Sequence, residues 1–130
     1  MDVVITCDKR FLLCRRAEQP ALGQWWLPGG RVRFGESIRD ACVRKCREEV
    51  GLNVTPGEIV SVEESVFDDP PVHTINTVIR AELLDSPDTL RLDSTQSEHA
   101  WMSLVPADLH ACVSNPLRKL GFPAAAGAQC

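Results

Sequence analysis

The sequence predicts a single domain of the α/β (α+β) class. Its 130 residues suit one domain rather than two. Hydrophobic residues make up 44% of the chain and charged residues 25%, enough for a buried core and a charged surface. Short apolar segments typical of strands flank one clear helix, and no internal repeat or linker divides the chain. We therefore expect one domain over residues 1–120 and a fraying tail over residues 121–130.

The first part of the chain predicts strands, a tight loop and the main helix. We expect two short strands within residues 3–14, an irregular stretch at 15–26 and a tight loop at 27–30. The main helix is expected at residues 37–50. The strands turn at Asp8, and the loop contains Pro28 and two adjacent glycines, which favour a sharp bend. Ser37 or Glu36 opens the helix, and Gly51 follows its end as a C-terminal stop.

The second part predicts further strands and two short helical pieces. We expect two strands at residues 59–67 and 74–84, followed by a polar loop at 85–96. A short strand at 101–104 and two helical pieces at 106–113 and 116–120 complete the chain. The strand at 74–84 is the cleaner of its pair, because apolar residues such as Ile75 and Ile79 recur on one face.

Charge and hydropathy exclude several kinds of partner. The formal net charge of -4 disfavours a nucleic-acid footprint, which needs clustered Lys and Arg. No apolar run approaches the roughly 18 residues that span a bilayer. The N-terminus has an acidic second residue and no cationic leader, which does not match a signal peptide. We expect a cytoplasmic protein that binds neither nucleic acid nor membrane.

The six cysteines show no CxxC pair and no regular spacing. Cys42 and Cys46 are four residues apart on the predicted helix, a spacing that would also allow a shared zinc ion. The favoured interpretation is buried small apolar side chains, with no disulfide in a reducing compartment.

One side of the predicted helix combines an apolar stripe with a charged border. Cys42, Cys46 and Val50 share the apolar side, and Glu48 and Glu49 lie on the adjoining arc with Lys45. Carboxylates beside a glycine loop are hard oxygen ligands of the kind that Mg²⁺ or Mn²⁺ takes. Taken alone, the helix also fits a solvated face with i,i+4 ion pairs.

Residues 30–52 resemble the Nudix box, G-x5-E-x7-R-E-U-x-E-E-x-G-U, where U is a bulky aliphatic residue. The positions in register are Gly30, Glu36, Arg44, Glu48, Glu49, Gly51 and Leu52. The resemblance implies an α/β/α sandwich around a mixed β-sheet, with the box forming a loop–helix–loop. It also implies Mg²⁺ or Mn²⁺ bound by Glu48, Glu49 and the Gly29 carbonyl, Arg44 orienting the carboxylates, and a homodimer.

The chain departs from the box at one position. The glutamate expected after the box arginine is Lys45 here. In many members this glutamate is a metal ligand or the general base, so Lys45 puts ordinary attack at phosphorus in doubt. A further acidic or amide ligand, often found about six residues before a tryptophan, is replaced by Thr95.

Residues 3–105 are most similar to the GDP-mannose mannosyl hydrolases, a subgroup that also lacks this glutamate and cleaves the sugar carbon–oxygen bond. The resemblance implies that Arg16 and Arg31 hold the diphosphate and that Arg31 also steadies the leaving group. The subgroup's catalytic histidine maps onto Gln96, whose amide can position a water but cannot take its proton. Trp25 is a candidate to stack on the base.

The predicted function is therefore metal-dependent hydrolysis of a nucleoside diphosphate linked to another group, with a nucleotide sugar favoured. The predicted catalytic residues are Arg44, Glu48, Glu49 and Arg31; the substrate contacts are Arg16, Arg31, Trp25 and Gln96. Two alternatives stay open. One is a pyrophosphohydrolase in which Glu36 or Glu98 replaces the missing glutamate, and the other is a module that binds nucleotide without turnover.

Overall fold

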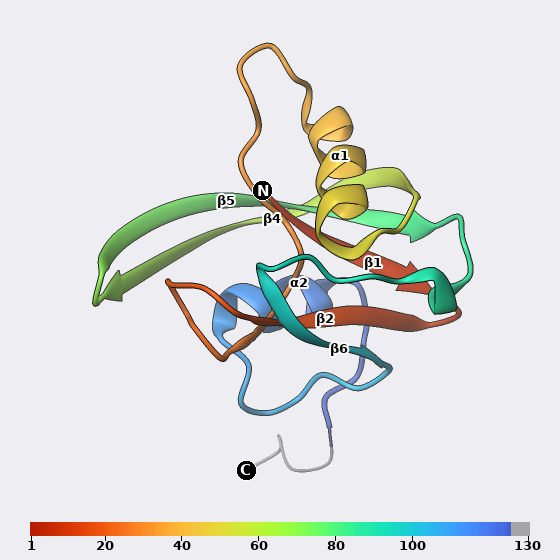
Figure 1. The fold of residues 1–130 in the computed structure, drawn as a ribbon. Coiled ribbons are helices and arrows are strands. Elements are labelled where there is room, and N and C mark those ends of the chain that lie inside the picture. Colours follow the sequence, from red (N-terminus) through yellow and green to blue (C-terminus); the bar gives the residue numbers. More distant parts are fainter. Residues whose placement is uncertain (126–130) are drawn as a thin grey trace.

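A computed structural model describes residues 1–125 (Figure 1). The strands are β1 (Asp2–Cys7), β2 (Arg10–Arg16), β3 (Trp25–Trp26), β4 (Val54–Asp68), β5 (Pro71–Leu83) and β6 (Gln96–Met102). The helices are α1 (Ile38–Val50), the short 3-10 turn η1 (Pro87–Thr89) and α2 (Ala111–Lys119).

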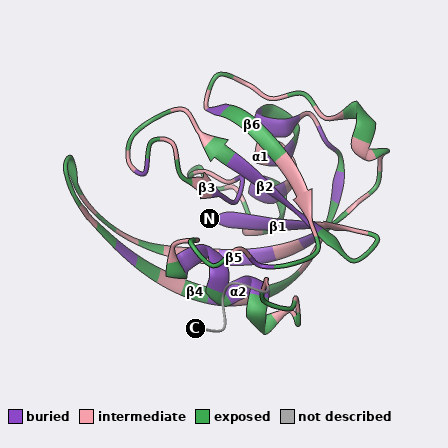
Figure 2. Ribbon diagram, turned by 90° about the horizontal axis from the view of Figure 1, so that it is seen from below, coloured by how far each residue is buried: buried purple, intermediate pink, exposed green. Residues whose placement is uncertain are grey.

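The strands form one mixed sheet in the order β3-β2-β1-β5-β4, with β6 also paired to β2. The β1–β5 pair is parallel and the other pairs are antiparallel. Strand β1 is buried along most of its length (Figure 2), and its side chains alternate between two cores. Val3 and Ile5 pack in the core that contains α1, whereas Val4 packs in the core that contains α2. The two helices therefore cover opposite faces of the sheet, which confirms the predicted α/β/α sandwich.

The local sequence explains the best-predicted elements. Asp8 and Lys9 both have positive φ angles, 48° and 63°, as a tight turn between β1 and β2 requires. Helix α1 begins after Ser37, whose hydroxyl accepts the backbone N–H of Asp40 at 3.0 Å. It ends at Gly51, which has a left-handed φ of 65°. The predicted helix is confirmed at both ends.

Several elements differ from the prediction. Strand β3 lies in the expected irregular stretch, and β4 begins at Val54, five residues before the expected start. Strand β6 begins at Gln96, inside the expected polar loop, because the whole segment pairs with β2; Gln96 itself is buried, and the next three polar side chains face water. The two expected C-terminal helical pieces are one helix, α2, with Pro116 inside it. Val113 and Leu117 are fully buried on that helix, and this packing offsets the hydrogen bond that Pro116 cannot donate.

The chain stays packed beyond α2. The backbone N–H of Val105 donates to Pro123 O at 2.8 Å, and Ala125 N donates to Val105 O at 2.9 Å. The rings of Phe11 and Phe122 meet edge-on with centroids 4.7 Å apart. The predicted fraying of the tail from residue 121 is therefore wrong for residues 122–125. The rest of the predicted tail lies outside the described residues.

Two further predictions concern cysteines and membranes. Cys14, Cys42 and Cys46 are free and fully buried beneath α1, and Cys112 is free and buried beneath α2, as expected for small apolar side chains, whereas Cys7 is only half-buried. Cys130 lies outside the described residues. Among residues 1–125, no helix combines the length and apolarity needed to cross a bilayer.

Candidate active site

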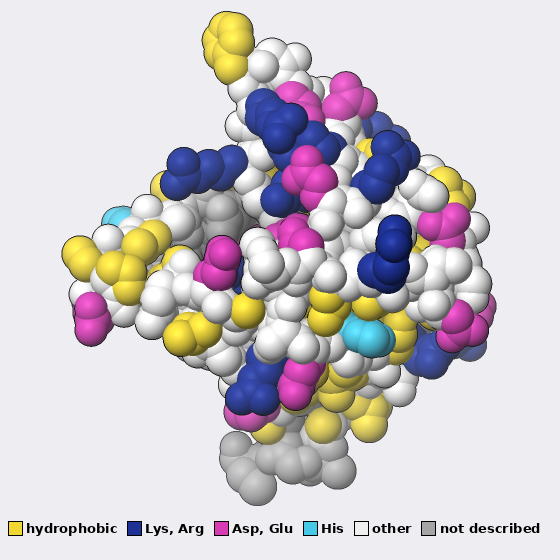
Figure 3. Space-filling model, viewed as in Figure 1, with side chains coloured by type: hydrophobic (Ala, Val, Ile, Leu, Met, Phe, Trp, Pro, Cys, Tyr) yellow, Lys and Arg dark blue, Asp and Glu magenta, His cyan; other side chains and the backbone are white. Residues whose placement is uncertain are grey.

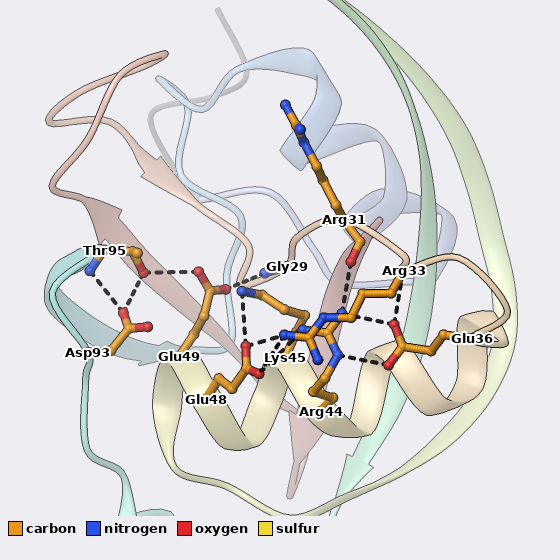
Figure 4. A network of polar contacts seen from close by, with 10 residues as sticks. All are labelled: Gly29, Arg31, Arg33, Glu36, Arg44, Lys45, Glu48, Glu49, Asp93 and Thr95. Carbon is orange, nitrogen blue, oxygen red and sulfur yellow. Dashed lines mark hydrogen bonds and ion pairs between the residues drawn. The ribbon is translucent and has the colours of Figure 1, made fainter.

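The loop before α1 is fastened to the helix by Arg44. Its guanidinium donates to both oxygens of Glu36, at 2.7 and 2.9 Å, and to the carbonyl of Arg31 at 2.9 Å (Figure 4). The backbone N–H of Arg33 also donates to Glu36, at 3.0 Å. The hydrogen bonds from Arg44 lower the pKa of Glu36 to about 2. Glu36 and Arg44 therefore position the loop rather than offer free charges to a ligand.

Glu48 lies among three cations on the next part of this surface. Its carboxylate is 3.2 Å from Arg44 Nη1, 3.4 Å from Lys45 Nζ and 3.8 Å from Arg33 Nη2. Although desolvation raises the pKa of Glu48, the Arg44 hydrogen bond and the Lys45 charge outweigh it and lower the pKa. Figure 3 shows basic and acidic side chains gathered over α1 and the loop before it.

Glu49 is the buried carboxylate of the site, with only 5% of its surface exposed. Its Oε1 accepts the backbone N–H of Gly29 at 2.7 Å, and its Oε2 accepts the hydroxyl of Thr95 at 2.9 Å. Asp93 contacts the same Thr95 hydroxyl. Burial raises the pKa of Glu49, opposed by the Gly29 hydrogen bond and the charge of Lys45. Glu49 thus connects α1 to the glycine loop and to the segment before β6.

A cleft of about 480 Å³ opens beside Gly29 and Gly30. Arg16 from β2 and Arg31 from the loop both line it. A smaller cavity of about 100 Å³ has Asp2, Arg16, Thr74 and Asn76 in common with the cleft, and it is also lined by Trp26, Phe67, Pro20, Ala21 and Ser65. The cleft therefore has a wide part with two guanidiniums and a narrower aromatic part, dimensions and chemistry that suit an anionic ligand carrying a flat ring.

A protein-family model described as the NUDIX domain matches residues 1–120. The chain belongs to the Nudix family. It is 30% identical over 106 residues to an ADP-ribose pyrophosphatase of Methanocaldococcus jannaschii, covering 82% of this chain and 63% of that protein. It is 33% identical over 104 residues to the low-salt glycan biosynthesis protein Agl8 of Haloferax volcanii, covering 75% of this chain and 65% of that protein. The chain thus spans less than two thirds of either relative.

Solved Nudix structures share the fold. A MutT Nudix hydrolase from Burkholderia pseudomallei superposes with a TM-score of 0.78 at 24% identity, over 92% of this chain and 94% of that one. The predicted Nudix membership and sandwich fold are therefore confirmed.

Nudix hydrolases generally use a divalent metal such as Mg²⁺. The side chains of this Nudix domain, as they lie, do not fit such an ion. Lys45 Nζ stands beside Glu48, and both oxygens of Glu49 already accept hydrogen bonds. A divalent ion at the predicted Gly29, Glu48 and Glu49 ligands would have to displace the Lys45 ammonium.

The Nudix domain brings together some predicted site residues and separates others. Glu48, Glu49 and Gly29 meet around Lys45, and Arg16 and Arg31 line the cleft (Figure 4). The other two predicted substrate contacts, Trp25 and Gln96, are not among the residues that line the cleft. Trp25 lines a different cavity, with Asp108 and His110. Gln96 is buried opposite Arg16 in the β2–β6 pairing, and its amide oxygen has no hydrogen-bond partner in the described part of the chain.

Two residues that line the cleft, Asp2 and Asn76, are not predicted from the sequence. Asp2 is buried at the start of β1, accepts the Trp26 indole N–H at 3.3 Å, and lines both parts of the cleft. Burial raises the pKa of Asp2 to about 6. An acidic residue directly before an apolar strand was the available signal. Asn76, on β5, carried no such signal, because it is one polar residue among many on an alternating strand.

Proposed function

We propose that this Nudix domain hydrolyses a nucleotide sugar and that it breaks the bond between the sugar carbon and the diphosphate oxygen. The oxygen of water bonds to the sugar carbon and one proton of that water is released to the solvent, while the nucleoside diphosphate leaves with the electron pair of the broken bond. Arg16 and Arg31 hold the diphosphate before and after this step. The predicted resemblance to mannosyl hydrolases belongs to this proposal.

The cleft supports the substrate class. Two guanidiniums at its wide part match the paired oxygens of a diphosphate, because the planar fork of arginine can donate two parallel hydrogen bonds. The narrower part, with Trp26 and Phe67, suits a nucleobase. The names of the two relatives agree with this substrate class. ADP-ribose is a nucleoside diphosphate linked to a sugar, and glycan biosynthesis uses activated sugars.

One observation carries the choice of bond. Attack at phosphorus requires a carboxylate to take the proton from water, and the box position for it holds Lys45, whose ammonium pairs with Glu48 at 3.4 Å. Breaking the sugar carbon–oxygen bond also releases a proton from water, but it does not use the glutamate that Lys45 replaces, and positive charge around the departing diphosphate favours it. Arg16 and Arg31 line the cleft and supply that charge, and Lys45 lies against the Gly30 backbone beside it.

The rival activity is pyrophosphohydrolysis at phosphorus, which the name of the archaeal ADP-ribose pyrophosphatase favours. Neither carboxylate predicted to replace the missing base is free in the structure. Glu36 is paired with Arg44, and Glu98 pairs with Arg15 at 3.4 Å on β6. Both carboxylates are therefore engaged with arginines.

The test is incubation with GDP-mannose, ADP-ribose and other nucleotide sugars, in Mg²⁺ and in EDTA, with phosphorus NMR of the products. Nucleoside diphosphate plus free sugar supports the proposal, whereas nucleoside monophosphate plus sugar phosphate indicates attack at phosphorus. Glu49→Gln should reduce turnover, and Glu82→Gln, an exposed carboxylate on β5, is the matched control. Absence of any product while GDP still binds would favour the module without turnover.

A further inference from the structure

Lys45 is packed into the site rather than extended into solvent. Only 18% of its side chain is exposed, little for a lysine on a helix surface. Its ammonium stands between the carboxylates of Glu48 and Glu49 (Figure 4), 3.4 Å from Glu48 Oε2. The box glutamate that would occupy this position carries the opposite charge.

Gly30 makes room for this side chain. A Cβ atom at Gly30 would lie 2.3 Å from Lys45 Cε and 2.8 Å from Lys45 Cδ, closer than carbon atoms approach, so the lysine side chain would have to move. The lysine stem therefore lies directly against the backbone of the loop that lines the cleft. The glycine that permits close backbone approach in this loop accommodates a cation of the protein itself.

The remaining groups around the carboxylates leave little for an added ion. Glu48 is shared by Arg44, Lys45 and Arg33, and each oxygen of Glu49 accepts a hydrogen bond. A divalent ion placed between these carboxylates would meet the Lys45 ammonium at close range, where like charges in a partly buried site repel strongly. Binding of the ion and retention of Lys45 in its observed position exclude each other.

We propose that the Lys45 ammonium is the built-in cation of this site and that the cleft binds a nucleoside diphosphate without a divalent metal. The diphosphate is held by Arg16 and Arg31, which line the cleft, and Lys45 adds its charge from behind the Gly30 backbone. The ligand class rests on the proposed function, whereas the exclusion of the metal by Lys45 does not.

The first arm of the test uses metal alone. Titration with Mn²⁺, followed by electron paramagnetic resonance, should show no saturable site near α1 in the unaltered protein. Lys45→Glu should create one, and Lys45→Met, which removes only the charge, should bind Mn²⁺ more tightly than the unaltered protein. The control is Lys119→Glu, which makes the same charge change at an exposed lysine on α2 and should not create a Mn²⁺ site. A saturable Mn²⁺ site in the unaltered protein that is lost in Glu49→Gln overturns the proposal.

The second arm measures GDP binding by calorimetry in EDTA and in Mg²⁺. The unaltered protein and Lys119→Glu should bind GDP equally in both buffers. Lys45→Glu should bind about tenfold more weakly in EDTA, with Mg²⁺ restoring the loss. A GDP affinity that needs Mg²⁺ in the unaltered protein overturns the proposal. No GDP binding in either buffer defeats the proposed substrate class, and the Mn²⁺ arm then decides the role of Lys45 by itself.

Discussion

Arg31→Ala is the most informative single substitution in the cleft. Arg31 is exposed and lines the wide part of the cleft, and in Figure 4 its side chain points away from the charged network on α1. Its backbone carbonyl accepts a hydrogen bond from Arg44, a contact that alanine keeps. Within residues 1–125 the Arg31 guanidinium makes no hydrogen bond or ion pair with the protein. Loss of this side chain should therefore change the free energy of unfolding by less than about 0.5 kcal/mol.

The effect on ligand binding should be much larger. A charge-assisted hydrogen bond to a phosphate contributes about 1.5–3 kcal/mol, which corresponds to a Kd raised about tenfold to a hundredfold or more. Calorimetric titration with GDP measures this change. Arg10→Ala is the matched control, because Arg10 lines another cavity with Pro87 and Asp88. The expected change in Kd is far larger than twofold. If the Kd of Arg31→Ala for GDP is within about twofold of that of the unaltered protein, the diphosphate does not lie beside Arg31.

Three further predictions concern stability and the aromatic contacts. The Arg44 hydrogen bonds hold the pKa of Glu36 at about 2, below its usual 4.5, so the stabilisation is present above pH 4.5 and is lost as pH falls through about 2. The free energy of unfolding in urea should therefore fall less at acid pH in Glu36→Gln than in the unaltered protein. The same pH dependence in both proteins would contradict this prediction. Leu117→Ala should lower the free energy of unfolding by about 2–5 kcal/mol because Leu117 is fully buried. Leu22→Ala, at a side chain 54% exposed, is its control and should change little. Trp25→Ala tests the predicted stacking on the base: because Trp25 lines a different cavity, GDP affinity should stay unchanged, and a clear loss would place the base beside it.

The elements that the sequence predicted best are those encoded by neighbouring residues. Ser37 and Gly51 mark the ends of α1 through local backbone chemistry, and the spacing of Lys45 and Glu48 fixes their contact on one helix. The resemblance to the Nudix box also implied that Gly29 and Glu49 lie close together, and the Gly29 N–H donates to Glu49.

The parts that could not be predicted depend on tertiary contacts. Asp2 and Asn76 reach the cleft because β1 and β5 pair in parallel, a register that no local pattern specifies. Thr95 meets Glu49 across 46 positions of sequence. The packing of Lys45 on Gly30 was also hidden, because it depends on where the loop folds back over the helix.

Hydrolysis of GDP-mannose in ¹⁸O-labelled water tests the central claim most directly, because it identifies the atom that water attacks even when the products are the same. Mass spectrometry of the sugar and phosphorus NMR of the nucleotide locate the label. Cleavage of the sugar carbon–oxygen bond predicts ¹⁸O in the free mannose and none in GDP. Label in a phosphate group of GDP, GMP or mannose phosphate would show attack at phosphorus and contradict the role assigned to the site around Lys45.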